Sequence, residues 1–230
     1  MKTLLLTLAV VVLLAVVWLV PIETVHAEAG RQDAPGAVRA ANLIYGSNKT
    51  SVCFSDEFLV QIQKETNIRT HPRFTPVKMD TGELFDYPFA VMTGEGSFSL
   101  TDEQRTNLKD YLELGGFVVA SAGCSSDPWN RSFKRELKKV FPDHETTVLS
   151  ADHPVFHTVY DIQYSVYKRG QRKLPELHGL EIDGRIALIW SPDGLNDTAN
   201  AGPSCCCCGG NEVKSARAIN VNLLAYALTY

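Results

Sequence analysis

Cysteine has the widest choice of chemistry among the residues of this chain, and four of its six cysteines form one unbroken run. The run lies in "GPSCCCCGGN", residues 202–211, and consists of Cys205, Cys206, Cys207 and Cys208. An extended chain sends alternate side chains to opposite sides, so four consecutive sulfurs do not readily enclose one tetrahedral ion. Neighbouring α carbons are about 3.8 Å apart, whereas an ordinary disulfide spans about 5.5 Å, so bridges to Cys53 or Cys124 are sterically easier.

Three chemistries stay open for the run. Disulfide bridges would staple a long irregular loop, and an oxidising location outside the cytoplasm favours them. A thiolate site would bind a soft metal, zinc or cuprous copper, where the flanking glycines and proline let the chain bend. A redox-active thiol pair is the third, although the flanking residues supply no positive charge to lower a thiol pKa. The run and Cys124 are therefore the first places to expect a site.

Polar residues also follow the predicted strands, where they could bind or cleave a substrate. Glu95 stands between two glycines, and Cys124 follows the apolar run "FVVASAG". In open α/β sheets ligands bind at the carboxyl ends of the strands. We therefore expect ligand-binding residues at these ends: Ser47, Asn48, Gly94, Glu95, Gly96 and Ser125. A solvated loop position fits Glu95 equally well.

One histidine has a carboxylate beside it. Asp152 precedes His153 and Pro154, and such a pair could bind a metal or move protons. Adjacent residues rarely converge on one atom, so a turn capped by the aspartate is the favoured interpretation. His153 therefore joins Cys124 and Glu95 only as a weak catalytic candidate. The other polar candidates are His157, Asp193 and Arg185, of which Arg185 is predicted to lie at the surface.

The N-terminus is typical of an export signal. An apolar run covers residues 4–20, Pro21 follows it, and Val25-His26-Ala27 places small residues where a signal peptidase cleaves. We expect a signal peptide over residues 1–27, a flexible leader over 28–40 and a periplasmic or secreted protein. The alternative is an uncleaved anchor that holds the domain outside the cytoplasm. Membrane contact is expected only in that case.

Composition and length limit the class of protein. The chain has 230 residues, 45% of them hydrophobic, and a net charge of -4. A negative balance gives no reason to expect a nucleic-acid partner. Residues 41–230 suit one domain with a full hydrophobic core. The expected partner is a small molecule or another protein outside the cytoplasm.

The elements that must position these residues alternate between strand and helix. Apolar runs predict strands over residues 41–46, 75–79, 89–96 and 117–121. Amphipathic stretches predict helices over residues 55–66, 100–116, 127–143 and 212–230, the first three capped by Ser55, by Thr101 with Gln104, and by Asp127. A hairpin over residues 179–190 turns at Asp183-Gly184. This order predicts a mainly parallel sheet with helices on both faces, followed by a C-terminal hairpin and helix.

Several phrases together resemble a known family. They are "LFDYPFAVMTGEGSFSL", "LKDYLELGGFVVAS", "FKRELKKVFPD", "DHPVF" and "INVNLLAYALTY". Over about Ala41 to Tyr230 the chain resembles a bacterial exported family with no assigned activity, domain of unknown function 4159. The resemblance implies a class I glutamine amidotransferase-like fold, which is built on a flavodoxin-like sheet.

That fold invites a catalytic interpretation, which the residues support poorly. Amidotransferases place a cysteine on a tight strand-to-helix elbow with glycines two before and two after it. Here Ala122 and Ser126 occupy those positions around Cys124, and no His-x-Glu pair follows near the C-terminus. A thiol without a placed base is a weak nucleophile. The leading hypothesis is a non-catalytic binding or interaction module; the alternatives are a hydrolase using Glu95 and Cys124, and a thiolate metal-binding protein using the cysteine run.

Overall fold

The computed structural model describes residues 36–47, 50, 53–167, 170–201 and 213–230, and all statements below concern these residues. Their central sheet has seven strands in the order β2-β1-β3-β4-β9-β8-β5. The bounds are β1 Ala40–Ile44, β2 Thr75–Lys78, β3 Phe89–Gly94, β4 Phe117–Ala122, β5 Thr146–Val148, β8 His178–Ile182 and β9 Arg185–Ser191. The first five strands of the order are parallel, and β8 and β5 are antiparallel to their neighbours. The order 2-1-3-4 followed by a further parallel strand is the flavodoxin-like one.

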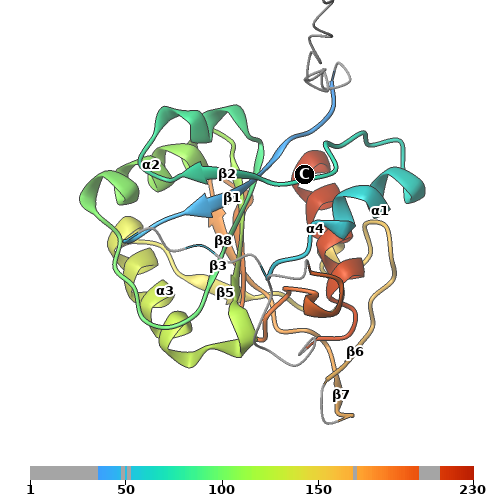
Figure 1. Cartoon of the computed structure of the whole chain (residues 1–230). Coiled ribbons are helices and arrows are strands. Elements are labelled where there is room, and N and C mark those ends of the chain that lie inside the picture. The colour runs from blue at the N-terminus through green and yellow to red at the C-terminus, as the bar shows by residue number, and fades with distance from the viewer. Residues whose placement is uncertain (1–35, 48–49, 51–52, 168–169, 202–212) are drawn as a thin grey trace, which may run out of the picture. The chain divides into compact units, whose positions relative to one another are not determined.

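Two helices cover each face of the sheet (Figure 1). Helices α1 and α4 lie on one face, and α2 and α3 lie on the other. Their bounds are α1 Glu57–Glu65, α2 Asp102–Glu113, α3 Asp127–Val140 and α4 Ala216–Thr229. Every residue of β3 and β4 is buried, which explains why both strands are almost wholly apolar in sequence. The predicted mixed α/β fold with a mainly parallel sheet is confirmed.

The remaining elements are short. Strands β6, Ser165–Val166, and β7, Arg172–Lys173, form a separate two-stranded sheet. Four 3₁₀ turns complete the described chain: η1 Gly82–Asp86, η2 Gly123–Ser125, η3 Pro154–Phe156 and η4 Thr198–Asn200. Among the helices in the described ranges, none combines the length and apolar character that crossing a bilayer requires.

The predicted helix caps are only partly right. The capping box of Thr101 with Gln104 begins α2 as predicted. Helix α3 is capped by Ser126 rather than Asp127, because the Ser126 hydroxyl accepts from the Trp129 amide three residues on. Helix α1 begins after Asp56, one residue later than the Ser55 cap predicted. The Ser55 hydroxyl still accepts a hydrogen bond from the Glu57 amide, at 3.2 Å.

The predicted hairpin is present, but the residue after its turn is not a plain surface arginine. Asp183 and Gly184 have φ values of 50° and 79°, as a two-residue hairpin turn requires. The Arg185 guanidinium then donates to the carbonyls of Leu112, at 2.9 Å, and Gly116, at 3.2 Å. These carbonyls belong to the end of α2 and the turn after it, and the Leu112 carbonyl also accepts from the Gly115 amide at 3.4 Å. Arg185 is thus half-buried, and its hydrogen bonds tie the hairpin to the end of α2.

Candidate functional site

The carboxyl ends of β1, β3, β4 and β9 meet at one edge of the sheet, because these strands are parallel. Tyr45, just after β1, donates from its hydroxyl to the Thr93 carbonyl at 3.0 Å. The same hydroxyl accepts from Nε1 of Trp129 at 2.6 Å. Burial raises the pKa of Tyr45 well above its ordinary value, so the hydroxyl stays neutral. Tyr45 therefore ties β1 to β3 and to the start of α3.

The loop after β9 packs against the ends of β3 and β4. The Leu195 amide donates to Oγ of Ser121 at 2.7 Å. Oδ1 of Asn196 accepts from Ser121 at 3.0 Å and from Oγ1 of Thr93 at 3.4 Å. Leu195 and Asn196 are both buried. This loop therefore fills the space in which an open α/β sheet often binds its ligand.

Two glycines allow this close packing. A β carbon on Gly94 would lie 2.5 Å from the Tyr45 hydroxyl. A β carbon on Gly194 would lie 2.7 Å from the Ala122 carbonyl, and Gly194 has a φ of +87°. Both positions need glycine because the neighbouring backbone and side chains leave no room. For Gly94, one of the predicted ligand-binding residues, the structure thus supplies a packing reason for its identity.

Of the other predicted ligand-binding residues, Ser47, Glu95, Gly96 and Ser125 lie at the same edge. Ser47 is exposed after β1, and Asn48 lies outside the described residues. The Gly96 amide donates to Oγ of Ser126 at 3.1 Å. Oγ of Ser125 donates to the Asp193 carbonyl at 2.6 Å. Gly96 and Ser125 thus hold loops together, and ligand binding by this set stays a prediction.

The structure brings Cys124 and Glu95 together. Sγ of Cys124 lies 3.3 Å from Oε1 of Glu95. Cys124 has a φ of 52° and a ψ of 33°, a left-handed conformation that is costly for a residue other than glycine. Cys124 and Cys53 each have an interaction partner.

His153 has a structural role in the turn that follows it. Its Nδ1 accepts from the Val155 amide at 3.3 Å, which caps η3, and its ring lies 5.4 Å from that of Tyr226. Burial lowers the pKa of His153, favouring the neutral ring that accepts this bond. Asp152 instead accepts from the Ser150 hydroxyl. The segment therefore forms a turn, and the His153 side chain caps the η3 turn within it.

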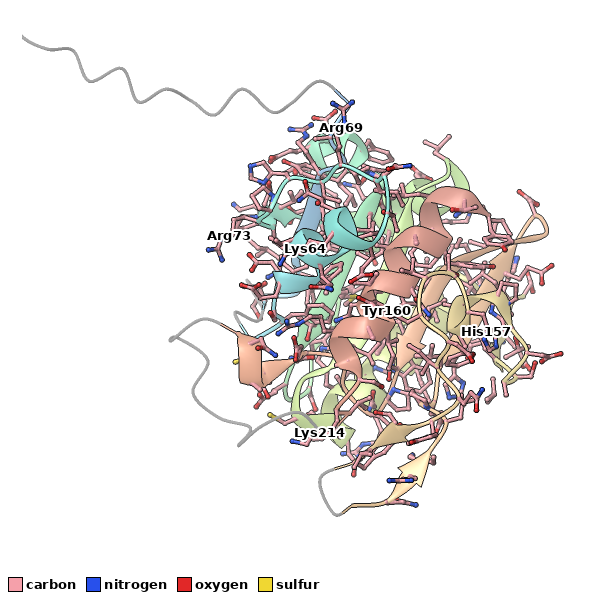
Figure 2. The ribbon with its side chains drawn as sticks, turned by 90° about the vertical axis from the view of Figure 1, so that its right-hand side faces the viewer. Lys64, Arg69, Arg73, His157, Tyr160 and Lys214 are labelled. Atoms are coloured by element: carbon pink, nitrogen blue, oxygen red, sulfur yellow. The ribbon has the colours of Figure 1, made fainter. Side chains whose placement is uncertain are left out.

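His157 lies on the loop that crosses α4 (Figure 2). Its Nδ1 is 2.7 Å from Oδ1 of Asp161, and its Nε2 is 2.7 Å from the Ala151 carbonyl. The Ala151 carbonyl and the Asp161 carboxylate raise the pKa of His157. Two oxygen acceptors suit the protonated ring, which donates from both nitrogens. Asn222 of α4 holds the same loop by accepting from the Tyr160 amide at 2.8 Å.

Asp193 connects the β6-β7 segment to the end of β9. Its Oδ2 accepts from the Tyr167 hydroxyl at 2.6 Å and lies 3.3 Å from Nζ of Lys173. The Glu176 amide also points to this carboxylate, at 3.4 Å. Burial and the neighbouring carboxylate raise the pKa of Tyr167, so the hydroxyl remains a donor. The sequence marked Asp193 only as a polar candidate, because its partners lie 17 to 26 residues away along the chain.

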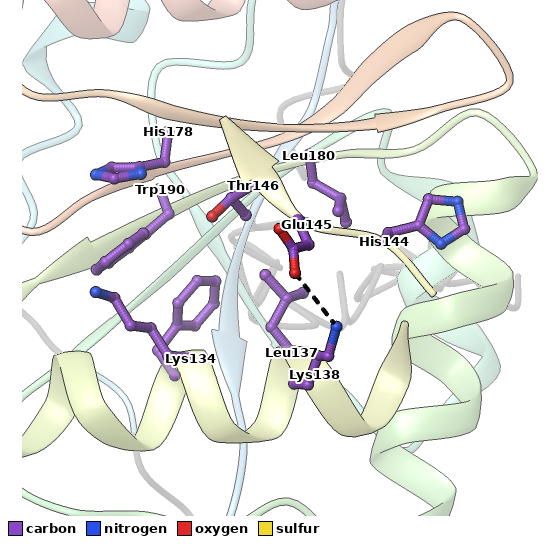
Figure 3. A pocket seen from close by; sticks show the side chains of 10 residues that line it. Lys134, Leu137, Lys138, His144, Glu145, Thr146, His178, Leu180 and Trp190 are labelled. Carbon is purple, nitrogen blue, oxygen red and sulfur yellow. Dashed lines mark ion pairs between the residues drawn. The ribbon is translucent and has the colours of Figure 1, made fainter. Parts of the chain in front are cut away.

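The structure also contains a pocket that the sequence did not indicate. The α3 pocket has a volume of about 370 Å³ and lies between the flank of α3 and the antiparallel strands (Figure 3). It is lined by Phe133, Lys134, Leu137, Lys138, His144, Glu145, Thr146, His178, Leu180 and Trp190. These residues belong to four separate segments of ordinary amphipathic sequence, so no local motif could have identified them. Such a volume falls within the range of small-molecule sites.

Two further pockets lie elsewhere on the surface. One, of about 480 Å³, includes Asp152 and His157 beside the end of α4. The other, of about 430 Å³, lies between η1 and the end of α2. Within the described part of the chain, no group of three histidine, cysteine or acidic residues is placed to hold a metal ion. The four consecutive cysteines lie outside the described residues, so their disulfide, zinc and copper chemistry stays a prediction.

The similarity to known proteins is one of family. Among curated proteins, none matches this chain. A family model described as "Domain of unknown function (DUF4159)" matches residues 40–228, which include the seven strands of the central sheet, helices α1 to α3 and all of α4 but its last residue. The predicted resemblance is confirmed at the level of the family. The chain belongs to the DUF4159 family.

Proposed function

We propose that this protein is a non-catalytic ligand-binding module that acts outside the cytoplasm on a class I glutamine amidotransferase-like scaffold. The observation that carries the proposal is the pairing of Cys124 with Glu95, at 3.3 Å. A cysteine nucleophile needs a base that accepts its proton and stabilises the thiolate. The contact described at this sulfur is a carboxylate and not the histidine of a cysteine-histidine pair.

The histidines of the described chain have other partners. His153 caps a turn, His157 binds Asp161, and Nε2 of His178 lies 2.7 Å from Oε1 of Glu176. The ring of His144 lies 5.5 Å from that of Phe141. Nδ1 of His71 lies 3.0 Å from the Arg73 carbonyl. These contacts occupy the described histidines with partners other than Cys124, as a module without a catalytic cysteine-histidine pair would have.

The amidotransferase-like part of the proposal is supported by topology. The flavodoxin-like strand order places Cys124 directly after β4, at a strand-to-helix turn that leads into α3. In that scaffold the equivalent turn carries the nucleophile. The apolar leader and Val25-His26-Ala27 in the sequence support export. Retained fold with lost chemistry is a common route to binding modules, since fold alone does not determine function.

A hydrolase is the second candidate, and one observation favours it. Cys124 and Ser125 both have a φ of 52°, and backbone strain of this kind often occurs at active sites. In such an enzyme Glu95 would act as the base for Cys124 or for a bound water. The same strain is equally explained by the sharp turn between β4 and α3.

Turnover measurements decide between the two candidates. The purified protein would be assayed with glutamine and with amide, ester and glycoside substrates, beside the Cys124→Ser and Glu95→Gln variants. We expect no turnover above the buffer blank for any of the three proteins. Turnover that either substitution abolishes would overturn the proposal and assign a hydrolase. If turnover survives both substitutions, repeating the assay on refolded protein would test for a contaminating enzyme. Turnover that persists in the refolded protein would also overturn the proposal.

A further inference from the structure

The two edge strands of the central sheet differ in the residues that protect them. Strand β2 forms one edge and β5 the other. Natural sheets often carry proline and lysine at their edges, because an unprotected edge offers unpaired amides and carbonyls to another strand. Strand β2 carries both, since Pro76 and Lys78 are exposed on it. Strand β5 carries neither: its sequence is TTV, three β-branched residues that favour an extended chain.

The pairing of β5 shows which of its backbone groups face outward. Strand β5 is antiparallel to β8, and in the same register the Leu149 amide donates to the Leu177 carbonyl at 2.8 Å. In an antiparallel pair every second residue bonds to its opposite neighbour, so Thr147 bonds to β8 as Leu149 does. The amides and carbonyls of Thr146 and Val148 therefore point away from β8. An added strand would pair with them without displacing any bond of the sheet.

The side chains of β5 leave this edge open to solvent. Val148 is 65% exposed, an unusual value for a valine in the central sheet of an α/β fold. It lies opposite His178, and Thr146 lies opposite Leu180, so these side chains share one face of the sheet. Leu180 packs in the core cluster beneath α2 and α3, which identifies the face as theirs. Val148 thus lies on the α3 side of the sheet, beyond the cover that α3 provides.

The flank of α3 nearest this edge is basic. Lys134 and Lys138 line the α3 pocket, and Figure 3 shows both rising from α3 toward the strands. Nζ of Lys134 lies 4.7 Å from the centre of the Trp190 ring and has no carboxylate within ion-pair distance among the described residues. Nζ of Lys138 lies 3.9 Å from Oε1 of Glu145, so it reaches the chain just before β5. Both partners of this long pair are mostly exposed, so exchanging Glu145 for another carboxylate costs little.

We infer that β5 is the docking edge for an extended, acidic peptide segment of a partner protein, which adds to the sheet as a strand beyond β5. Its main chain bonds to the outward groups of Thr146 and Val148, and these bonds supply affinity with little dependence on sequence. Its alternate side chains point to the α3 side, where carboxylates meet Lys138. The basic flank therefore selects an acidic segment from other extended chains.

A second copy of this chain fits the edge less well. Two β5 strands that pair antiparallel in one continuous sheet are related by a two-fold axis perpendicular to that sheet. Both α3 helices would then lie on the same side, and their basic flanks would face each other across the junction. The inference goes beyond the proposed function, because β9 and β8 separate β5 from β4 and from Cys124.

Fluorescence anisotropy of a labelled peptide, titrated with the purified full-length protein, tests the inference. The probe is a capped nonapeptide in which glutamate and valine alternate, and the matched peptide has lysine in place of every glutamate. We expect the glutamate peptide to bind at least about threefold more tightly, since one exposed ion pair contributes a factor of this size. Lys138→Ala should remove that preference. Lys109→Ala should retain it, because Lys109 is an exposed, paired lysine on α2.

Val148→Pro tests the main-chain pairing. Proline lacks the outward amide, and it is tolerated in edge strands where that amide faces solvent. We expect this variant to bind the glutamate peptide about fivefold more weakly, which is the effect of one lost hydrogen bond. Val148→Thr is the matched control, because it keeps both the amide and the β-branched shape, and it should bind as the wild type does.

Circular dichroism shows whether each variant is folded, and amide chemical shifts locate the peptide. The inference requires shifts at residues 145–149 and 178–180. It would be overturned by equal affinity for the two peptides, by wild-type affinity in a folded Val148→Pro variant, or by shifts confined to another face. If proline unfolds the protein, the two peptides and Lys138→Ala still decide the question.

Sedimentation of the protein without peptide tests the second-copy alternative. We expect a monomer, and a dimer that Lys138→Ala strengthens and Val148→Thr leaves unchanged would assign the edge to self-association and overturn the inference. These results are distinct from turnover. Substrate hydrolysis would overturn the proposed function alone, and absent peptide binding would overturn this inference alone.

Discussion

The Glu136 carboxylate of α3, only 1% exposed, lies 2.8 Å from Nη2 of Arg105 on α2. The carboxylate also accepts from the Leu100 amide at 3.3 Å and from Nζ of Lys139 at 2.9 Å. Burying a charge is costly unless it is paired and hydrogen-bonded, and this one is both. The contact joins the two helices that cover one face of the sheet.

Replacement of Glu136 by alanine should therefore destabilise the protein. The expected loss is roughly 2–4 kcal/mol, somewhat less than for a fully buried pair because Arg105 reaches solvent. Urea unfolding followed by circular dichroism measures it. Glu113→Ala on α2 is the matched control, since its exposed pair with Lys109 contributes at most about 0.5 kcal/mol. Equal losses for the two variants would contradict the importance of burial.

Acid should weaken the same contact. Burial raises the pKa of Glu136, but hydrogen bonds from Lys139 and Arg105 outweigh it, so the pKa is lowered overall. A carboxyl with a lowered folded pKa stabilises the fold above its ordinary pKa and loses that effect as pH falls through the folded value. Wild type should therefore lose more melting temperature between neutral and acid pH than Glu136→Gln does. An identical pH dependence of the melting temperature in both proteins would show that the Glu136 carboxylate does not contribute to it.

His157 should make a contribution of the opposite sign. Its pKa is raised by the Ala151 carbonyl and by Asp161, so its stabilising effect is complete below the ordinary histidine pKa. The effect is lost as pH rises through the folded value. Melting temperatures of wild type and His157→Gln should thus differ most below the ordinary histidine pKa of about 6.5 and converge as pH rises above the raised folded pKa. Adding Asp161→Asn to the His157→Gln variant should change its melting temperature little further. A large additional loss of melting temperature would show that the His157-Asp161 pair is not the source of the pH-dependent stability.

Asp193→Ala should loosen the β6-β7 segment without unfolding the sheet. The Tyr167 hydroxyl and the Lys173 ammonium would lose their acceptor, which costs about 1–3 kcal/mol for a partly buried group. Hydrogen exchange should accelerate at residues 165–176 and stay unchanged in β3 and β4. Asp143→Ala, an exposed carboxylate after α3, is the control. Uniform acceleration across the sheet would mean that Asp193 supports the whole fold instead.

The state of the four consecutive cysteines can be determined by reduction and chelation. If the run forms bridges to Cys53 or Cys124, each should contribute about 2–4 kcal/mol, and reductant should lower the melting temperature. A chelator should then have no effect. If the run binds zinc or copper, chelation should destabilise the protein and release titratable thiols. The Cys206→Ser, Cys207→Ser double variant would leave both measurements unchanged if the run has neither role.

The sequence by itself determined the main strands, the four helices and their layering, but not the short strands β5, β6 and β7. Continuous apolar runs are visible locally because a strand covered on both faces must be apolar at every position, as β3 and β4 are. The α2 capping box and the Asp183-Gly184 turn are likewise local, since their hydrogen bonds or φ angles involve residues at most a few positions apart. The cap of α3 was misplaced by one residue, because serine and aspartate cap equally well and only the backbone entering the helix selects between them.

Only the tertiary structure decided what the polar residues contact. Cys124 and Glu95 are 29 residues apart, and Arg185 and Leu112 are 73 apart, so their pairing depends on strand order and register. The α3 pocket has the same origin: a helix, a loop and three strands each supply side chains that carry no motif of their own. Hydrophobic periodicity reports whether a side chain faces the core, but it carries no information on which distant side chain it meets there. For that physical reason the fold could be predicted from this sequence, and the contacts of its candidate site could not.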